Sequence, residues 1–117
     1  RDSYWLVGGK PKQGTLNDLE RNLKNVKEIF TFGEASITFY KKLKNKVNTT
    51  PFKSLKNAIN FAFKKAIIEE ESINFVLSPA CSSFDEFENF EERGSFFKQT
   101  IKRLIKEQKL NEYKKSD

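Results

Sequence analysis

The chain has 117 residues, of which 37% are hydrophobic and 14% aromatic, enough apolar surface for one folded domain and too much for a disordered chain. A single cysteine, Cys81, and no histidine exclude an internal disulfide framework and argue against a structural zinc site, and no apolar run approaches the roughly 18 residues of a membrane span. The net charge of +6 permits an acidic partner, but the lysines are scattered over expected helix faces and no nucleic-acid-binding motif is present, so we expect neither nucleic acid nor a membrane as a partner.

Strand and helix signals alternate through the first half of the chain. Residues 4–8 form a short apolar run closed by two glycines, which predicts a strand and a turn. Thr15 is a suitable N-cap for a helix whose leucines recur at helical spacing at positions 16, 19 and 23. Residues 26–32 predict a second strand, which Gly33 ends, and residues 35–43 predict a short helix.

The second half continues this alternation. Residues 47–50 predict a weak strand, which Pro51 separates from the strongest helix signal of the chain. That helix carries an apolar stripe with i, i+3, i+4, i+7 spacing, made by Leu55, Ala58, Ile59, Ala62, Ala66 and Ile67. Residues 73–77 predict a buried strand, and residues 90–105 predict an amphipathic helix with Phe97, Ile101, Leu104 and Ile105 on one face.

Repeated strand–helix units with short connections are typical of a parallel sheet covered by helices on both faces. We therefore expect an α/β fold: a Rossmann-like three-layer sandwich with a mainly parallel sheet of four to six strands. The expected domain covers residues 1–105, and residues 106–117 form a polar C-terminal tail that is frayed or helical. The chain begins at Arg1, without Met, directly before an apolar run, as a piece of a longer protein would.

Two of the expected strand-to-helix loops carry chemistry. In a parallel sheet all such loops open at the carboxyl ends of the strands, so the loop at residues 8–14, with Lys12, and the loop at residues 79–89, with Ser83, are expected at one edge. The first loop has two glycines and two lysines but lacks the spacing of a P-loop. Taken alone, this loop favours a tight turn with solvated lysines over a binding loop.

The second loop is suited to an anion. It brings the hydroxyls of Ser82 and Ser83 near an expected helix start, where exposed N–H groups such as that of Phe90 favour a carboxylate or phosphate. The competing reading is that Ser83 or Asn89 only caps the helix. A serine nucleophile is not expected because no histidine is available as its base, and Cys81 reads as a small packed residue. The acidic residues at positions 85, 86, 88, 91 and 92 read as solvated.

Residues 77–85 (LSPACSSFD) and 89–94 (NFEERG) resemble the C-terminal signature of the bacterial Mur ligase family, in the members that add D-glutamate. The start of the chain is similar as well, with an apolar strand, two glycines and Lys12, and so is the junction at residues 32–35. The Asp-Asn-Pro-Arg motif of family members that add diamino acids is absent.

The resemblance implies the third domain of a three-domain, ATP-dependent amide ligase of peptidoglycan precursor synthesis, cytoplasmic, bacterial and monomeric. In such enzymes ATP phosphorylates the carboxylate of UDP-N-acetylmuramoyl-L-alanine, and the amine of D-glutamate attacks the acyl phosphate. By motif position, Lys12, Ser83 and the backbone N–H of Phe90 hold the D-glutamate carboxylates. The resemblance places ATP and Mg²⁺ mainly outside this fragment, which is expected to hold no catalytic residue or metal site and to be inactive alone.

Two alternatives stay open on the sequence. One is the substrate domain of a related ligase that makes polyglutamate or recycles murein. The other is a stand-alone α/β binding module for an acidic partner, which the net charge of +6 favours.

Overall fold

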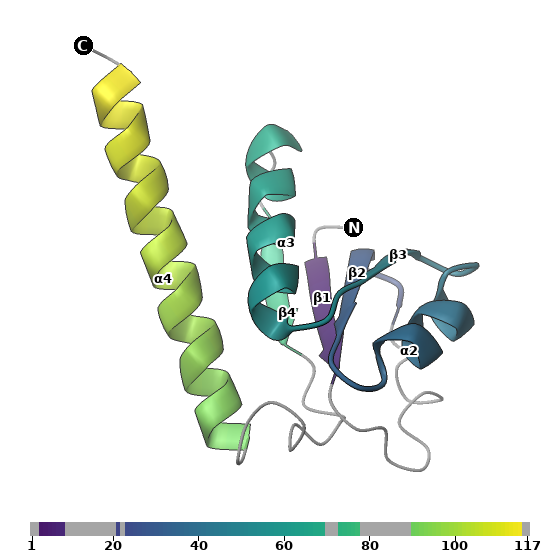
Figure 1. Cartoon of the computed structure of the whole chain (residues 1–117). Coiled ribbons are helices and arrows are strands. Elements are labelled where there is room, and N and C mark those ends of the chain that lie inside the picture. Colours follow the sequence, from purple (N-terminus) through teal and green to yellow (C-terminus); the bar gives the residue numbers. More distant parts are fainter. Residues whose placement is uncertain (1–2, 9–20, 22, 70–72, 78–89, 116–117) are drawn as a thin grey trace.

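The protein is an open parallel sheet with helices on both faces (Figure 1). The computed structural model describes residues 3–8, 21, 23–69, 73–77 and 90–115. Within these residues four strands pair, all parallel, in the order β3-β2-β1-β4: β1 (Ser3–Gly8), β2 (Val26–Phe32), β3 (Asn48–Pro51) and β4 (Asn74–Leu77). The helices are α2 (Ser36–Leu43), α3 (Leu55–Glu69) and α4 (Phe90–Lys115). The predicted α/β sandwich is confirmed.

Most element bounds follow the hydrophobic pattern, and the differences have simple causes. Pro51, expected just beyond a strand, is the last residue of β3. This is possible because β3 is an edge strand, where a residue without an N–H breaks no ladder on its open side. The polar tail is helical as far as Lys115. The helix expected around residues 16–23 falls almost wholly outside the described residues. None of the helices in the described part of the chain is both long and apolar enough to cross a bilayer.

The larger apolar cluster lies between the sheet and helices α3 and α4. Because side chains alternate along a strand, Tyr4 and Leu6 of β1 share one face with Phe30 and Phe32 of β2. They pack against the buried stripe of α3 (Leu55, Ala58, Ile59 and Ala62), with Phe96, Phe97, Ile101 and Leu104 of α4 at the margin. The Tyr4 ring joins neighbouring strands through contacts to Phe30, at 5.2 Å between centroids, and to Phe75 of β4, at 5.7 Å.

The opposite face of the sheet is covered by α2. Val7 and Ile29 alternate with the residues above and pack against Phe39 and Leu43 of α2, all of them almost fully buried. One apolar cluster lies on each face of the sheet, so the helices on the two faces and the sheet between them make the three layers visible in Figure 1. Full burial of side chains of this size is worth about 1.5–3 kcal/mol each, so these two clusters are the main source of stability.

Charged residues close the amino-terminal end of the sheet. Ser3 pairs with Val26 but Tyr4 pairs with Glu28, so Lys27 is an extra residue in β2, a bulge. Glu28 is only 4% exposed, and its carboxylate accepts from Lys65 Nζ at 2.6 and 2.7 Å and from Asn48 Nδ2 at 3.1 Å.

A second carboxylate at the same end, that of Glu69, lies at the C-terminal end of α3. Lys27 Nζ and Tyr4 Oη (2.8 Å) both donate to it. The hydrogen bond from Lys27, followed by that from Tyr4, lowers the pKa of Glu69 below its ordinary value. The stripe of α3 therefore ends in ion pairs that tie the helix to the first two strands.

Candidate functional site

The strand order reverses between β1 and β4. From β1 the chain adds β2 and then β3 on one side, and it returns to place β4 on the other side of β1. Leu6 pairs with Leu77, the last residue of β4, and Gly8 ends β1 just beyond, so both strands end at the same edge. Neighbouring strands lie about 4.8 Å apart. In open α/β sheets, ligands bind outside the carboxyl ends of the strands at such a reversal.

Gly8, the last residue of β1, allows close packing directly below this edge. It pairs with Phe32 of β2 and is buried. A Cβ on Gly8 would lie 2.6 Å from ring atoms Cγ and Cδ2 of Phe32 and nearer still to the Phe32 carbonyl oxygen. Because real Cβ atoms do not approach so closely, only glycine fits here without displacing β2.

Hydrogen bonds fix the half of the edge that belongs to β2 and β3. The buried Thr31 hydroxyl donates to the Ser36 carbonyl at 2.9 Å and lies 2.9 Å from the Ser36 hydroxyl, which accepts from the Phe52 N–H at 3.2 Å. Gly33, with φ of 80°, makes the turn into α2, and its N–H donates to the Lys53 carbonyl. The loops after β2 and β3 are thus held together and form a fixed wall beside the ends of β1 and β4.

The N-terminus of α4 supplies donors that have no intrahelical acceptor. Phe90 is the first residue of α4, and the first four N–H groups of a helix lack such acceptors. Glu91 and Glu92 occupy the first turn and are exposed. These two acids already complement the helix dipole, so a bound anion at this helix end also needs a cation from elsewhere.

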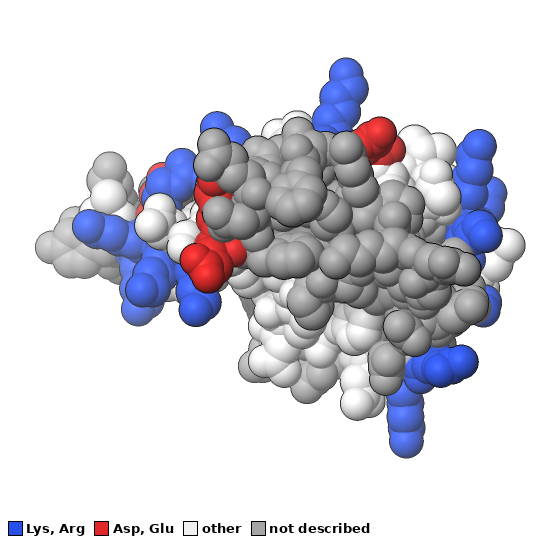
Figure 2. Space-filling model, turned by 90° about the horizontal axis from the view of Figure 1, so that it is seen from below, with Lys and Arg blue, Asp and Glu red and all other residues white. Residues whose placement is uncertain are grey.

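Charges on the described part of this side do not gather in one place. Figure 2 looks onto the edge where the strands end, and the described Lys and Arg side chains spread around the outline of the molecule. This distribution is what solvated surface charges give.

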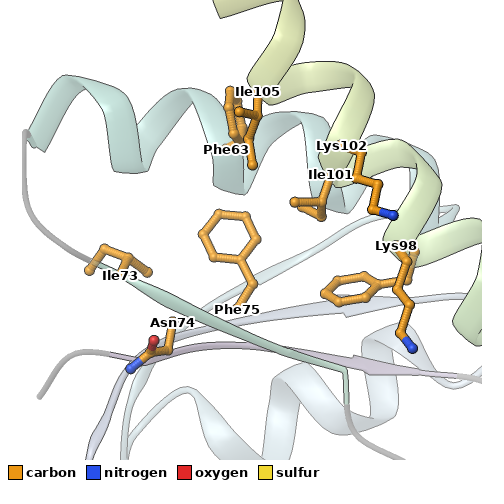
Figure 3. Close-up of a pocket in the computed structure, with 9 residues that line it drawn as sticks. Phe63, Ile73, Asn74, Phe75, Lys98, Ile101, Lys102 and Ile105 are labelled. Carbon is orange, nitrogen blue, oxygen red and sulfur yellow. The ribbon is translucent and has the colours of Figure 1, made fainter.

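A hollow with an apolar lining lies at the other end of β4, away from the edge where the strands end. It has a volume of about 420 Å³ and is lined mainly by apolar side chains of α3, β4 and α4, among them Phe63, Phe75 and Ile101 (Figure 3). Its position is fixed by Asn74, which pairs with Ser3 at the start of β1, away from the carboxyl ends of the strands. An apolar groove there does not suit a small dicarboxylate.

Comparison with curated proteins gives consistent matches. The chain is 36% identical over 104 residues to the UDP-N-acetylmuramoylalanine–D-glutamate ligase of Wolbachia sp. subsp. Brugia malayi. The aligned residues make up 89% of this chain and 21% of that ligase. The ligase of the same name from Rickettsia felis is 37% identical over 105 residues, or 89% of this chain and 23% of the ligase. The ligase of the same name from Caulobacter sp. is 35% identical over 103 residues, which are 88% of this chain and 22% of that ligase.

The chain therefore spans about a fifth of the length of the curated relatives it matches, and the match falls in their C-terminal part. The sequence belongs to the C-terminal domain of the Mur ligases. A scan against protein-family models gave no match.

In this Mur ligase C-terminal domain, the structure positions the strands that carry the predicted site. Lys12 follows β1 and Ser83 follows β4, and those two strands are adjacent and end at one edge. Lys12 and Ser83 themselves lie outside the described residues, so their contacts stay a prediction. Phe90 is the first residue of α4, and its role as an N–H donor to the substrate stays a prediction.

Sequence reasoning did not anticipate the two ion-paired carboxylates of the Mur ligase C-terminal domain. Their signal lies in the helical period, because Lys65 follows Ala62 by three residues and Glu69 follows it by seven, on the buried stripe of α3. In β2, Glu28 stands in phase with Phe30 and Phe32, which points it toward the same face. Charges in phase with a buried stripe indicate paired, interior groups.

Proposed function

We propose that this domain holds D-glutamate for an ATP-dependent ligase that joins it to UDP-N-acetylmuramoyl-L-alanine in peptidoglycan precursor synthesis, in the bacterial cytoplasm. The names of the relatives support this substrate pair. The observation that carries the proposal is the parallel pairing of β1 with β4, because the loops that bear Lys12 and Ser83 leave the sheet from these two strands at the point where the strand order reverses.

The proposed donors match the chemistry of a dicarboxylate. The Lys12 ammonium supplies the cation that the helix end, already flanked by acids, needs for anion binding. The Ser83 hydroxyl and the Phe90 N–H supply directed hydrogen bonds to carboxylate oxygens, and hydrogen bonds to a charged acceptor are stronger than neutral ones. Two or three such donors at one edge hold the substrate through its carboxylates and leave its amine available.

The role of the domain in the reaction is to aim that amine. In the proposed reaction, ATP supplies the phosphoryl group that activates the carboxylate of the nucleotide-sugar substrate. The D-glutamate amine then attacks this carbon, an amide bond forms and phosphate leaves. Closure of this domain onto the ATP site would bring the amine within attacking distance, and such positioning is a large part of catalysis.

Magnesium and ATP have no assigned residue in this chain. Among the residues that the structure describes, no group of three His, Cys, Asp or Glu side chains could hold a metal ion. We assign to this domain the binding and orientation of the amino acid.

Ser83→Ala in the complete enzyme tests the site directly. Loss of a hydrogen bond to a charged group costs about 1.5–3 kcal/mol, so the KM for D-glutamate is expected to rise roughly 10- to 150-fold. Ser82→Ala is the matched control and is expected to leave this KM unchanged. An unaltered KM in Ser83→Ala, with D-glutamate as the varied substrate, would contradict the proposal.

Lys12→Ala in the complete enzyme tests the cation. The expected rise in the KM for D-glutamate is of the same order as for Ser83→Ala, while Lys10→Ala, two residues earlier in the same loop, is expected to have little effect. Equal effects of the two substitutions would remove Lys12 from the site. A preference of the complete enzyme for an amino acid other than D-glutamate would overturn the substrate assignment.

A further inference from the structure

A second hollow lies between the N-terminal end of α3 and the middle of α4. Its volume is about 280 Å³, and it is lined by Lys56 of α3 and by Phe96, Gln99, Thr100 and Arg103 of α4. It has no lining residue in common with the apolar groove of Figure 3. The described residues that line it come from α3 and α4, and none comes from β1 or β4.

Thr100 is the most unusual of these lining residues. It is only 6% exposed, yet among the described residues its hydroxyl has no hydrogen-bond partner. A helical threonine commonly donates to a carbonyl of the preceding turn, and a buried hydroxyl without a partner costs about 1–3 kcal/mol. A hydroxyl that lines a cavity and lacks a protein partner is available to a ligand.

The remaining polar groups of this cavity favour an anion. Lys56 and Arg103 bring two cations and Gln99 an amide, and none of the described residues that line the cavity carries a carboxylate. Lys56 stands in the first turn of α3, which contains no acidic residue, so the helix dipole adds positive potential there.

Arg103 is able to turn toward a ligand. Its guanidinium pairs with the Glu107 carboxylate at 3.9 Å, and both side chains are more than half exposed. Exposed pairs of this kind contribute at most about 1 kcal/mol, less than a charge-assisted hydrogen bond to a bound oxyanion.

We propose that this cavity, lined by Lys56, Gln99, Thr100 and Arg103, is a binding site for a phosphate group. The arginine and lysine neutralise the charge, and the threonine hydroxyl donates to a third oxygen, an arrangement that suits a tetrahedral oxyanion with several acceptors. This proposal rests on residues of α3 and α4 alone, so neither it nor the proposed function depends on the other. The bound group is either free phosphate or the phosphate of an ester.

Titration of the ¹⁵N-labelled 117-residue chain, at constant ionic strength, tests the site. With inorganic phosphate we expect saturable shifts of amide resonances centred on Lys56, Gln99, Thr100 and Arg103. A parallel titration with glycerol 1-phosphate distinguishes the two sources, because tighter binding of the ester identifies an esterified phosphate as the ligand. Equal or weaker binding of the ester identifies free phosphate.

Three variants decide whether the binding is specific. Arg103→Gln is expected to raise the dissociation constant for phosphate about tenfold and Thr100→Val several-fold, while Lys102→Gln, which removes the neighbouring charge from α4, leaves it unchanged. Shifts that do not saturate, an equal loss in Lys102→Gln, or saturable shifts confined to the ends of β1 and β4 would each overturn the proposal. If Thr100→Val does not fold, Lys56→Gln, at an exposed position, takes its place and is expected to weaken binding as Arg103→Gln does.

Discussion

Gly8→Ala is expected to destabilise the protein by pushing β2 away from β1. The added methyl carbon would lie 2.6 Å from ring atoms of Phe32 and even nearer to the Phe32 carbonyl oxygen, which is main chain and cannot rotate away. Overpacking of a buried position typically costs about 1–3 kcal/mol, and contact with main chain puts Gly8→Ala at the upper end. Replacing glycine by alanine also restricts the unfolded chain, which returns about 0.4–1 kcal/mol. The expected net loss is about 2 kcal/mol.

Gly94→Ala is the matched control for this substitution. Gly94 lies inside α4, and an added Cβ there meets no atom within 4 Å. Alanine in a helix interior is better than glycine by about 0.5–1 kcal/mol, so this variant is expected to be slightly more stable than the wild type. The two glycine-to-alanine changes should therefore differ by about 3 kcal/mol, with opposite signs relative to the wild type.

Urea unfolding monitored through Trp5, the one tryptophan of the chain, measures both variants. For a slope of about 2 kcal/mol/M, Gly8→Ala should unfold at a midpoint lower by about 1 M, with a thermal midpoint lower by roughly 10 °C. The reasoning is refuted if Gly8→Ala unfolds at the wild-type midpoint, or if Gly94→Ala is destabilised as strongly as Gly8→Ala.

Two further predictions concern the ion pairs at the amino-terminal end of the sheet. Because the folded-state pKa of Glu69 is lowered from the usual value of 4.5, its stabilisation is complete above that pH and is lost as the pH falls through the folded value. Urea midpoints measured between pH 5 and 3 should therefore fall less steeply for Glu69→Gln than for the wild type or Glu107→Gln, and parallel curves would contradict this. Lys65→Met leaves the buried Glu28 carboxylate without its cation and should cost about 2–3 kcal/mol, less than a fully buried pair because Lys65 is 33% exposed. The exposed Lys64→Met should cost nearly nothing in the same assay, and equal losses would show that the pair is not what Lys65 contributes.

The sequence was sufficient for most of the described elements and for the class of fold. The bounds predicted for β2 agree with the structure because the strand ends just before Gly33, the one glycine in the described part of the chain with a positive φ, here 80°. The stripe of α3 was also evident, and Leu55, Ala58, Ile59 and Ala62 are all buried. Both signals are local, so they can be read without knowing the partners that these residues contact.

What the sequence could not provide is the order of the strands. The pairing of β1 with β4, on which the candidate site depends, joins Ser3 to Asn74 and is decided by packing across the sheet, for instance by the stacking of Tyr4 on Phe75. The bulge at Lys27 and the burial of Glu28 likewise depend on the cations and helix ends that the fold brings near them. The roles of Lys12 and Ser83 rest on resemblance and stay predictions.

The pairing of β1 with β4 also determines when, during folding, the candidate site can form. During synthesis, β1, β2 and β3 can associate through contacts between near neighbours in the chain, whereas β4 must close a loop that contains all of them. Any partly folded form in which β4 has not paired has only the β1 side of the candidate site. A nascent chain is therefore expected to gain the ability to bind ligand in one late step, when β4 pairs with β1, and not gradually.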